Sequence, residues 1–561
     1  MDRTGTRRLL NIAAALLLAQ TTATSIQNFV VIHRQPLGFD DAYMFLRYAH
    51  NIRHGFGFSW NLDRIHTYGP TSLLWSFCTL LFSYLPTDPW TQLILGSWLF
   101  SFAAVIAMAW AVAANAHSDW LRSPLRVLPL IAVPLFASTL FQGNQFNGME
   151  TMLATTLCAL FAGLCLLWRV GRVHPAIVGC VAFLLFLARP ESAVVALLLP
   201  LLLRLLPDNP RPPLRSLTVL YATFFTGVII ELILCRLYFG TPIPLSVYMK
   251  GGHAYLGYSS IWYPSLQLIA FLTALQLFLA ALILLARRRD LRLILASTTP
   301  AIVIFAYLGT VTQIMGFDSR YYIPYAPLII IPAILVLDRW LTSPTNETAW
   351  PGHTFGMRVT ATAVMLIFFF AFSSQGVQAK FRRLEHGHHF EYDPAQLNIT
   401  ATTPLPVVDW QPMMKDITDD LIAPLPPGTT VAATEVGYLG ERTSQINVID
   451  LAGLNDTDIA LHGFDISRFL ARKPDLIWMP NFAYTYQRAA LVSDPTFLAR
   501  YDLYADAGNY GIAIRKDSPV RPQIEHQLGI FWSHVYPSTD PSAYLVHSAT
   551  WTGLKHSVPN N

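Results

Sequence analysis

Eleven long apolar runs constrain the fold of this 561-residue chain more than any other feature. They lie at residues 9–31, 91–115, 125–141, 147–168, 174–188, 191–204, 215–238, 260–286, 291–315, 322–338 and 357–374. About 20 apolar residues cross the hydrocarbon core of a bilayer. The chain is therefore predicted to be a polytopic α-helical membrane protein with about 11 transmembrane helices. Its composition agrees, since 53% of the residues are hydrophobic and only 13% are charged.

The topology depends on a twelfth apolar segment, residues 71–86, which is short and ends at a proline. If this segment does not cross, every second loop carries two to four arginines, as the positive-inside rule requires of cytoplasmic loops. Crossing would move the later basic loops to the outside, so we expect an interfacial or re-entrant segment. We interpret the run after MDRTGTRRLL as an uncleaved first span rather than a signal peptide. The N-terminus is then cytoplasmic and the tail extracytoplasmic.

The chain after residue 375 changes character. Strand-like pieces such as TTVAATEVGYL, QINVIDLAGL and YGIAIRK alternate with helical stretches such as ISRFLARK. We predict a transmembrane domain at 1–375, with a first external loop at 33–90, and a soluble extracytoplasmic α/β domain at 376–561. The aromatic residues of that domain could stack on a glycan, although core packing is the expected role for most of them. These residues are Trp410, Trp478, Tyr484, Tyr486 and Trp532.

The unusual polar residues of the membrane half all fall in the loops predicted to be external. Ionisable groups at the edge of several spans are functional candidates, because placing charge near lipid costs a few kcal/mol unless it is paired or hydrated. Neighbouring tyrosines are added as candidate substrate contacts. The full set is Asp40, Asp41, Tyr43, Arg47, Tyr68, Glu150, Arg189, Glu191, Tyr248, Lys250, Asp318 and Arg320.

Asp40 and Asp41 are the sharpest candidates. Adjacent side chains project in different directions, so one carboxylate can act as a general base while its neighbour positions a cation. Mg²⁺, Mn²⁺ or Ca²⁺ would suit such oxygen ligands, although no spacing demands a metal and no cofactor is otherwise expected. The structural alternative is a helix cap, since aspartate before AYMFLRYAHNI would cap that amphipathic run well.

The cations have two interpretations as well. Lys250 is the only lysine in the first 379 residues, and a lysine near Arg236 would suit a phosphate at the membrane surface. It could instead be a helix-end lysine whose charged head reaches the interface. Arg189 and Glu191 flank a tight turn and could belong to an ion-pair network as readily as to a substrate site. The small net charge of +4 predicts no nucleic-acid partner.

The stretches DDAYMFLRYAHNIRHGFGFSWN and YGPTSLLW resemble the opening external loop of the membrane-embedded GT-C glycosyltransferases, in the branch of the terminal β-1,2-arabinofuranosyltransferases. GMET, ARPES, RLYFGTPIPLSVYMK, DSRYYIPYAPLI and EVGYLGERTSQINVIDLAGLNDTDIA are similar to that branch's later landmarks, in the same order. The resemblance spans residues 40–516. It departs at Tyr68, where related loops often carry an acidic residue, and at Phe317, where Gly-Gly-Asp is common.

The resemblance implies an inverting glycosyltransferase in the bacterial cytoplasmic membrane. A polyprenyl-phosphate sugar, arabinofuranose among the candidates, would be the donor, and a cell-envelope glycan or glycolipid the acceptor. Asp40, or Asp41 as the other candidate, would deprotonate the acceptor hydroxyl. Lys250, Arg320 and Arg189 would hold the lipid phosphate, and Glu150 would help bind sugar. A lipid-linked sugar flippase and a non-enzymatic polysaccharide assembly protein are the alternatives, although no internal repeat and no mid-membrane charges favour the first.

Overall fold

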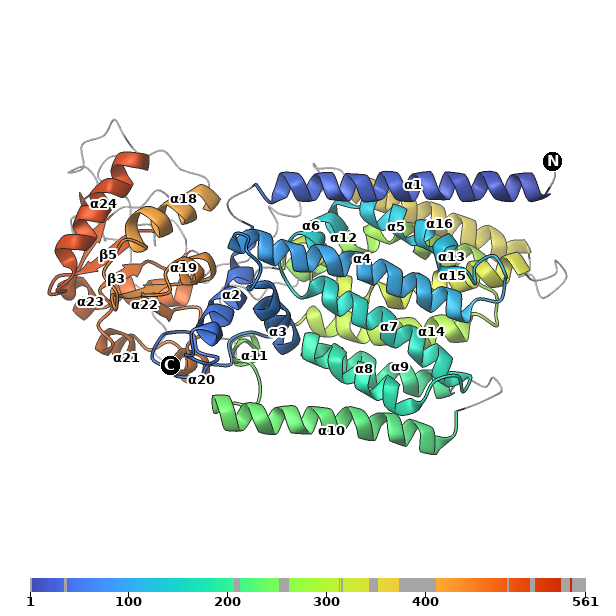
Figure 1. Cartoon of the computed structure of the whole chain (residues 1–561), viewed down its shortest axis with the longest axis horizontal. Helices are drawn as coiled ribbons and strands as arrows, with labels where there is room; N and C mark the ends of the chain where they lie inside the picture. The colour runs from blue at the N-terminus through green and yellow to red at the C-terminus, as the bar shows by residue number, and fades with distance from the viewer. Residues whose placement is uncertain are drawn as a thin grey trace.

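The computed structural model describes residues 3–34, 38–205, 212–251, 262–311, 313, 316–342, 352–372, 410–481, 484–504, 510–535 and 545–546. A helical bundle forms the N-terminal part, and a mixed α/β domain lies against one end of it (Figure 1). The bundle consists of α1 (Arg3–Ile32), α2 (Asp40–Arg53), α3 (Leu73–Phe82), α4 (Pro89–Asn115), α5 (Pro124–Ala137), α6 (Thr139–Gln145), α7 (Thr151–Arg169), α8 (Pro175–Ala188), η1 (Pro190–Ser192), α9 (Ala193–Leu205), α10 (Leu214–Phe239), α11 (Leu245–Gly251), α12 (Trp262–Ala274), α13 (Gln276–Leu285), α14 (Leu291–Leu308), η3 (Phe317–Ser319), η4 (Ile323–Tyr325), α15 (Pro327–Thr342) and α16 (Gly352–Phe372).

Each of the eleven apolar runs contains helix over most of its described part. Five helices are long and apolar enough to cross a membrane: α1, α4, α7, α10 and α14. Three further helix pairs pass the same test but are sharply bent, namely α5 with α6, α12 with α13, and the η3–η4 turn with α15. The other three runs form α8, α9 and α16, of which α8 and α9 have only 14 and 13 residues. The described chain therefore has the helices of a multi-pass membrane protein.

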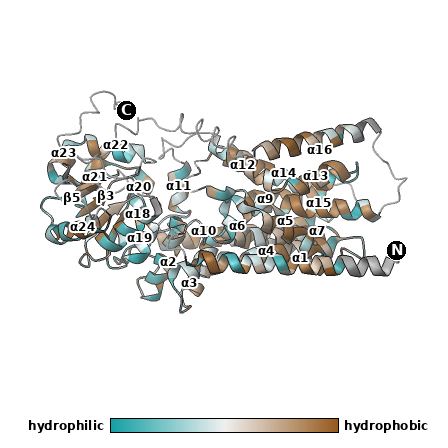
Figure 2. Ribbon diagram, turned by 90° about the horizontal axis from the view of Figure 1, so that it is seen from above, coloured by the Kyte–Doolittle hydropathy of each residue, from teal (hydrophilic) through white to brown (hydrophobic). Residues whose placement is uncertain are grey.

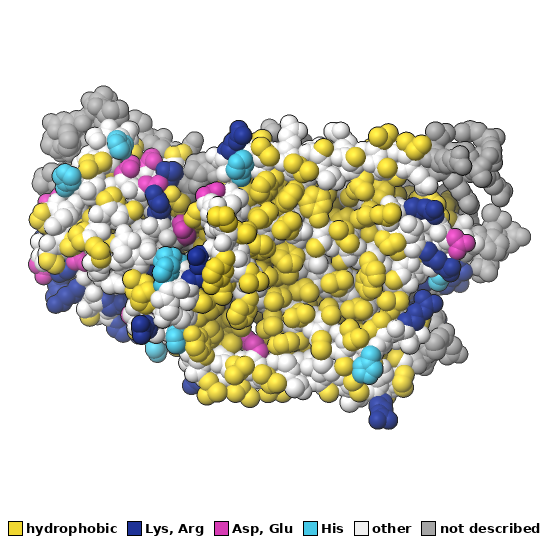
Figure 3. Space-filling model, in the orientation of Figure 1, with side chains coloured by type: hydrophobic (Ala, Val, Ile, Leu, Met, Phe, Trp, Pro, Cys, Tyr) yellow, Lys and Arg dark blue, Asp and Glu magenta, His cyan; other side chains and the backbone are white. Residues whose placement is uncertain are grey.

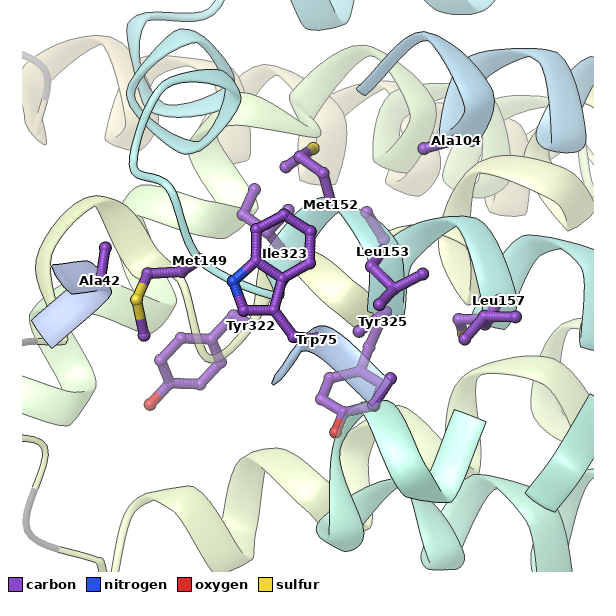
Figure 4. Close-up of a cluster of buried hydrophobic side chains, with 14 of the residues drawn as sticks. Ala42, Trp75, Ala104, Met149, Met152, Leu153, Leu157, Tyr322, Ile323 and Tyr325 are labelled. Carbon is purple, nitrogen blue, oxygen red and sulfur yellow. The ribbon is translucent and has the colours of Figure 1, made fainter. Parts of the chain in front are cut away.

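The twelfth apolar segment does not form a full-length span. Its helix α3 has ten residues, which corresponds to about 15 Å, or half of the hydrocarbon core. Trp75 anchors it to the bundle, because this side chain is fully buried and its Nε1 donates to the carbonyl oxygen of Gly148 at 3.1 Å. Figure 4 shows the indole among Ile323, Leu153 and other apolar side chains. This length of α3 agrees with the interfacial or re-entrant segment expected at residues 71–86, and the topology itself stays a prediction.

Polar loops gather at the two ends of the bundle. At one end, Asp338 accepts from the backbone N–H groups of His117 and Ser118, and Arg339 pairs with Asp290 at 2.9 Å. Helix α4 connects this end to the other, where α2, α3 and the C-terminal domain lie (Figure 1). The surface between the ends is mostly apolar in Figure 3, and the basic side chains there lie toward the ends. Figure 2 shows the same contrast between a hydrophobic bundle and a more hydrophilic C-terminal domain.

The C-terminal domain is built on a mixed sheet of strand order β2-β1-β3-β5-β4-β6. Strand β1 pairs in parallel with β2 on one side and β3 on the other, while β5 and β4 continue the sheet antiparallel. Its elements are α18 (Trp410–Asp416), η6 (Ile417–Ile422), β1 (Thr430–Ala433), α19 (Gly437–Arg442), β2 (Asn447–Asp450), α20 (Thr457–His462), α21 (Ile466–Ala471), β3 (Leu476–Trp478), α22 (Thr485–Ser493), α23 (Pro495–Arg500), β4 (Tyr501–Tyr504), β5 (Ile512–Arg515), α24 (Arg521–Val535) and β6 (Leu545–Val546).

This arrangement agrees with the α/β domain expected in the tail. The expected domain boundary at residues 375 and 376 lies outside the described residues. Trp478, Tyr484 and Trp532 are buried, as core packing requires, whereas Tyr486 is exposed. The side chain of Trp410 is not among those described.

Candidate active site

Asp40 joins the membrane part to the C-terminal domain. It is the first residue of α2, whose N-cap residue, Phe39, makes no side-chain capping bond. Its carboxylate instead accepts the backbone N–H groups of Gly437 and Tyr438, at 3.0 and 2.7 Å, where α19 begins. Burial raises the pKa of Asp40 to about 6, against the lowering effect of the Tyr438 N–H, and the neighbouring charge of Asp41 adds to the rise. Asp40 therefore caps a helix, but that helix lies 397 residues away in the chain.

Asp41 points to a different partner. Its Oδ2 lies 3.4 Å from Nη2 of Arg320, and it is the more accessible of the two aspartates. Arg320 is 3% exposed, and its guanidinium also lies 4.9 Å from the ring centre of Phe39. Its Nε and Nη1 are buried without a hydrogen-bond partner in the described structure. A buried guanidinium with two unused donors provides directional hydrogen bonds for an anion.

Tyr321 brings three cations together. Its hydroxyl accepts from Arg320 Nη2 at 3.2 Å and from Lys250 Nζ at 3.3 Å. The guanidinium carbons of Arg189 and Arg320 lie 4.9 and 5.0 Å from its ring centre. Residues from three separate loops thus converge on one phenol, as the predicted clustering of external loops requires. Tyr321 was not among the residues that the sequence pattern singled out.

Arg189 belongs to an ion-pair network. Its Nε lies 2.7 Å from Glu191, and its Nη1 lies 3.3 Å from Glu150 and 3.4 Å from the backbone oxygen of Arg320. All three ionic side chains are largely buried. Two carboxylates offset the charge of Arg189, so Lys250 and Arg320 remain as the cations with the greater capacity to bind an anion.

Glu435 of the C-terminal domain extends the cluster. It lies just beyond the carboxyl end of β1, which pairs in parallel with β2 on one side and with β3 on the other. Open α/β sheets bind ligands at such a point, outside the carboxyl ends of the strands. Asn481, which follows β3, donates to the Oε1 of Glu435. Burial, followed by the charges of Asp40 and Asp41, raises the pKa of Glu435 to about 8. Glu435 was not among the residues that the sequence pattern singled out, because it lies inside the strand-like piece TTVAATEVGYL, whereas the strand itself ends at Ala433.

Arg47 lies in the interface between the domains. It is 1% exposed, and its five N–H groups are matched by five acceptors, so none remains for a substrate. Its acceptors are the carbonyl oxygens of Trp60, Gly440, Thr443 and Ile446 and the side-chain oxygen of Asn61. The geometry assigns Arg47 to domain docking in place of the substrate contact expected for it.

The remaining predicted residues make no hydrogen bond to this cluster within the described structure. Tyr43 is buried in α2 between Trp90 and Tyr438, and its hydroxyl has no partner in the described structure. The Tyr68 hydroxyl donates to Glu231 of α10 at 2.9 Å. Tyr248 is half-buried on α11. The carbonyl oxygen of Asp318 accepts from Asn144 at 2.7 Å, and its backbone has a φ of 53°.

No group of three or more His, Cys, Asp or Glu side chains that could hold a metal ion occurs among the described residues. Both carboxylate oxygens of Asp40 already accept backbone N–H groups. A divalent cation at the aspartate pair would therefore depend mainly on Asp41, whose side chain faces Arg320. The arrangement suits anion binding beside a carboxylate better than it suits a metal centre.

Replacing Gly437 with alanine is expected to destabilise the docking of α19 on α2 by about 1–3 kcal/mol. A Cβ at this position would overlap the backbone carbonyl of Asp40, which cannot move without shifting α2. Thermal unfolding and limited proteolysis of the full chain would measure the effect. The matched control is Gly529→Ala in α24, where no atom lies within 4 Å of the added Cβ. There we expect a gain of about 0.5–1 kcal/mol, because alanine favours helix. Equal stability in the two variants would contradict the tight contact.

The interface is expected to lose stability as the pH rises. The pKa of Glu435 is about 8 in the folded state and ordinarily about 4.3 in an unfolded chain, so between these values the native state retains a proton that the unfolded chain has lost. Stability therefore falls across that window. Glu435→Gln should flatten the fall by on the order of 1 kcal/mol in thermal unfolding from about pH 5 to about pH 9. Asp517→Asn, at a carboxylate 79% exposed, should leave the slope unchanged. An unchanged slope in Glu435→Gln would refute the assignment.

The fold and the site define a multi-helix membrane protein. Its cluster of carboxylates and cations lies where the helical bundle meets the C-terminal α/β domain. A family model described as "Domain of unknown function (DUF8728)" matches residues 410–523, which extend from α18 into α24. No curated protein and no solved structure matches the chain.

Proposed function

We propose that the protein is an inverting glycosyltransferase that moves a sugar from a polyprenyl-phosphate donor to an extracytoplasmic glycan or glycolipid. The observation that carries the proposal is the contact of Asp41 with Arg320, whose Nε and Nη1 are buried and unused. A carboxylate that can take a proton thus lies beside a cation that can bind a phosphate. The cluster lies at one end of the apolar bundle, where a lipid-linked donor and a water-soluble acceptor can both reach it.

The proposed reaction uses these groups directly. The acceptor hydroxyl oxygen attacks the anomeric carbon while Asp41 takes the hydroxyl proton. The bond between that carbon and the phosphate oxygen breaks, and the electron pair leaves with the polyprenyl phosphate. Arg320 and Lys250 stabilise the negative charge that develops on the phosphate. Tyr321 holds both cations in place through its hydroxyl.

The residues of the network around Arg189 have supporting roles in this proposal. Glu150 and Glu191 keep Arg189 in place, and Arg189 in turn bonds the backbone of Arg320. Glu435 and Asn481 follow the carboxyl ends of β1 and β3, which is where open α/β sheets bind ligands. We assign them to the acceptor because their carboxylate and amide groups suit sugar hydroxyls.

The test is a transfer assay with the purified full chain in lipid nanodiscs. Short-chain polyprenyl-phosphate arabinofuranose and other polyprenyl-phosphate sugars would be offered with oligosaccharide acceptors, and mass spectrometry would detect the product. We expect transfer from at least one donor, with inverted anomeric configuration. Absence of transfer from every donor, together with movement of the lipid-linked sugar across vesicle membranes, would favour a transporter instead.

A further inference from the structure

Helix α11, which carries Lys250, lies between the helical bundle and the C-terminal domain. It has seven residues and packs beside α20 (Figure 1, Figure 2). Its start is tied to the segment that precedes α3. The N–H of Leu245 donates to the carbonyl oxygen of Tyr68 at 2.8 Å. The hydroxyls of Ser246 and Thr71 lie 3.0 Å apart. Lys250 is in the last turn of α11, and a different contact holds that end of the helix.

This second contact is with the apolar core of the C-terminal domain. Leu245 and Met249 are 0% and 2% exposed, and a spacing of four residues places them on one face of α11. Both belong to an apolar cluster whose other buried members, among the described residues, all come from the C-terminal domain. Ile449, Leu451 and Ile459 are three of these members. Two side chains of the membrane part thus complete a core of the other domain.

Gly453 receives the end of the Met249 side chain. It follows β2 and has a φ of 74°, a conformation in which a residue with a side chain is strained. A Cβ at this position would lie 2.8 Å from Met249 Sδ and 2.9 Å from Met249 Cε. Met249 can approach the backbone here because Gly453 has no side chain. The C-terminal domain therefore determines where Met249 lies, although Met249 belongs to the membrane part.

Lys250 is the residue directly after Met249. Its Nζ donates to the hydroxyl of Tyr321 at 3.3 Å and lies 5.8 Å from the centre of that ring. Lysine carries its charge on a flexible four-carbon stem, so its ammonium group stays in one place more readily when its backbone is fixed. Arg320, the other cation bonded to this hydroxyl, lies in the helical bundle between η3 and η4. The two cations of the pair are thus held by different domains.

We propose that the C-terminal domain forms part of the anion site by holding Lys250 against Tyr321. Met249 and Gly453 are the positioning residues. In the docked protein, Lys250 and Arg320 form a pair of cations around one hydroxyl. Without the contact at Gly453, the last turn of α11 loses its anchor and the site retains Arg320 alone. That the anion is the phosphate of a lipid-linked sugar rests on the proposed function.

The test measures how fast Lys250 reacts with formaldehyde and cyanoborohydride in the full chain in nanodiscs. Lys250 is the only lysine in the first 379 residues, so mass spectrometry can follow its dimethylation separately. The exposed Lys473 serves as the internal reference. Thermal unfolding of each variant would show that the fold is retained.

Gly453→Ala is expected to raise the rate of labelling at Lys250 several-fold, because the added Cβ displaces Met249 and frees Nζ from Tyr321. Gly463→Ala is the matched control in the same domain. Gly463 has a φ of 75°, so alanine is strained there as well, but no atom lies within 4 Å of the added Cβ. We expect the wild-type rate at Lys250 in this control. The comparison thus separates the contact with Met249 from the strain of the backbone.

Met249→Ala and Val247→Ala give the same comparison from the side of α11, and they replace it if Gly453→Ala does not fold. Met249→Ala removes the side chain that reaches Gly453, whereas Val247 is 40% exposed and its replacement should leave Lys250 unchanged. In transfer assays, displacement of Lys250 should raise the KM for the donor by on the order of tenfold and leave the KM for the acceptor unchanged. A mere loss of folded protein would lower the apparent kcat and change neither KM.

Folded Gly453→Ala and Met249→Ala proteins in which Lys250 reacts at the wild-type rate would overturn the proposal. The labelling needs no sugar transfer, so its result is independent of the proposed function. Faster labelling of these variants, in a protein that transfers no sugar, would support the placement of Lys250 and contradict the glycosyl transfer. Unchanged labelling in an active enzyme would do the reverse.

Discussion

Replacing Asp41 with asparagine is expected to lower kcat for glycosyl transfer by about 10²–10⁴-fold, because the amide cannot take the proton of the acceptor hydroxyl. Asparagine keeps the size of the side chain and an oxygen for Arg320 Nη2, which now lies 3.4 Å from Asp41. The KM for the donor should stay the same or fall, since a negative charge beside the phosphate site has been removed. Steady-state kinetics with the donor varied at saturating acceptor would separate the two effects.

Asp40→Asn is the matched comparison at the adjacent position. Its amide would place a donor against one of the N–H groups of Gly437 and Tyr438 that Asp40 now accepts. We expect a loss of about 1–3 kcal/mol in the stability of domain docking, with a smaller effect on kcat in the fraction that remains folded. The opposite pattern, with full activity in Asp41→Asn and none in a folded Asp40→Asn, would assign the base to Asp40.

Much of the membrane part could be predicted from the sequence, because its determinants are local. A run of about 20 apolar residues specifies a span by itself. The alternation of basic and non-basic loops was enough to place Asp41, Arg189, Lys250 and Arg320 in one set. In the structure, Arg189 and Lys250 contact Tyr321, and Arg189 also bonds the backbone of Arg320. Asp41 pairs with the side chain of Arg320. The bends at residues 138 and 275 were harder to predict from the sequence, because they interrupt runs whose apolar character is continuous.

The docking of the C-terminal domain could not be predicted in the same way. Its contacts join residues almost 400 positions apart, and many of the partners are backbone groups, which every residue carries. Arg47 illustrates the difficulty, because a lone arginine in a polar loop looks the same whether it binds a substrate or a set of carbonyl oxygens. Glu435 follows a short strand without any neighbouring charge pattern, and its importance comes from the aspartates that the fold places near it.

Arg47→Met is expected to destabilise the docked state by about 3 kcal/mol or more. Methionine preserves much of the apolar packing of the side chain, but four carbonyl oxygens, three of them from the C-terminal domain, lose a charged donor. Because these acceptors are buried, water replaces the donor poorly. Denaturant unfolding of the full chain would measure the loss, and limited proteolysis would show release of the C-terminal domain.

Arg53→Met, on the same helix, provides the control for this prediction. Arg53 is exposed and bonds only the carbonyl oxygen of Ser83 among the described residues, besides lying over the ring of Tyr84. Its replacement should change stability by less than about 1 kcal/mol. A large effect of Arg47→Met with little effect of Arg53→Met would show that α2 holds the C-terminal domain in place. Transfer activity should then fall with docking, because Glu435 and the N–H groups that fix Asp40 both come from that domain. Full transfer activity in an undocked Arg47→Met protein would instead confine the active site to the membrane helices.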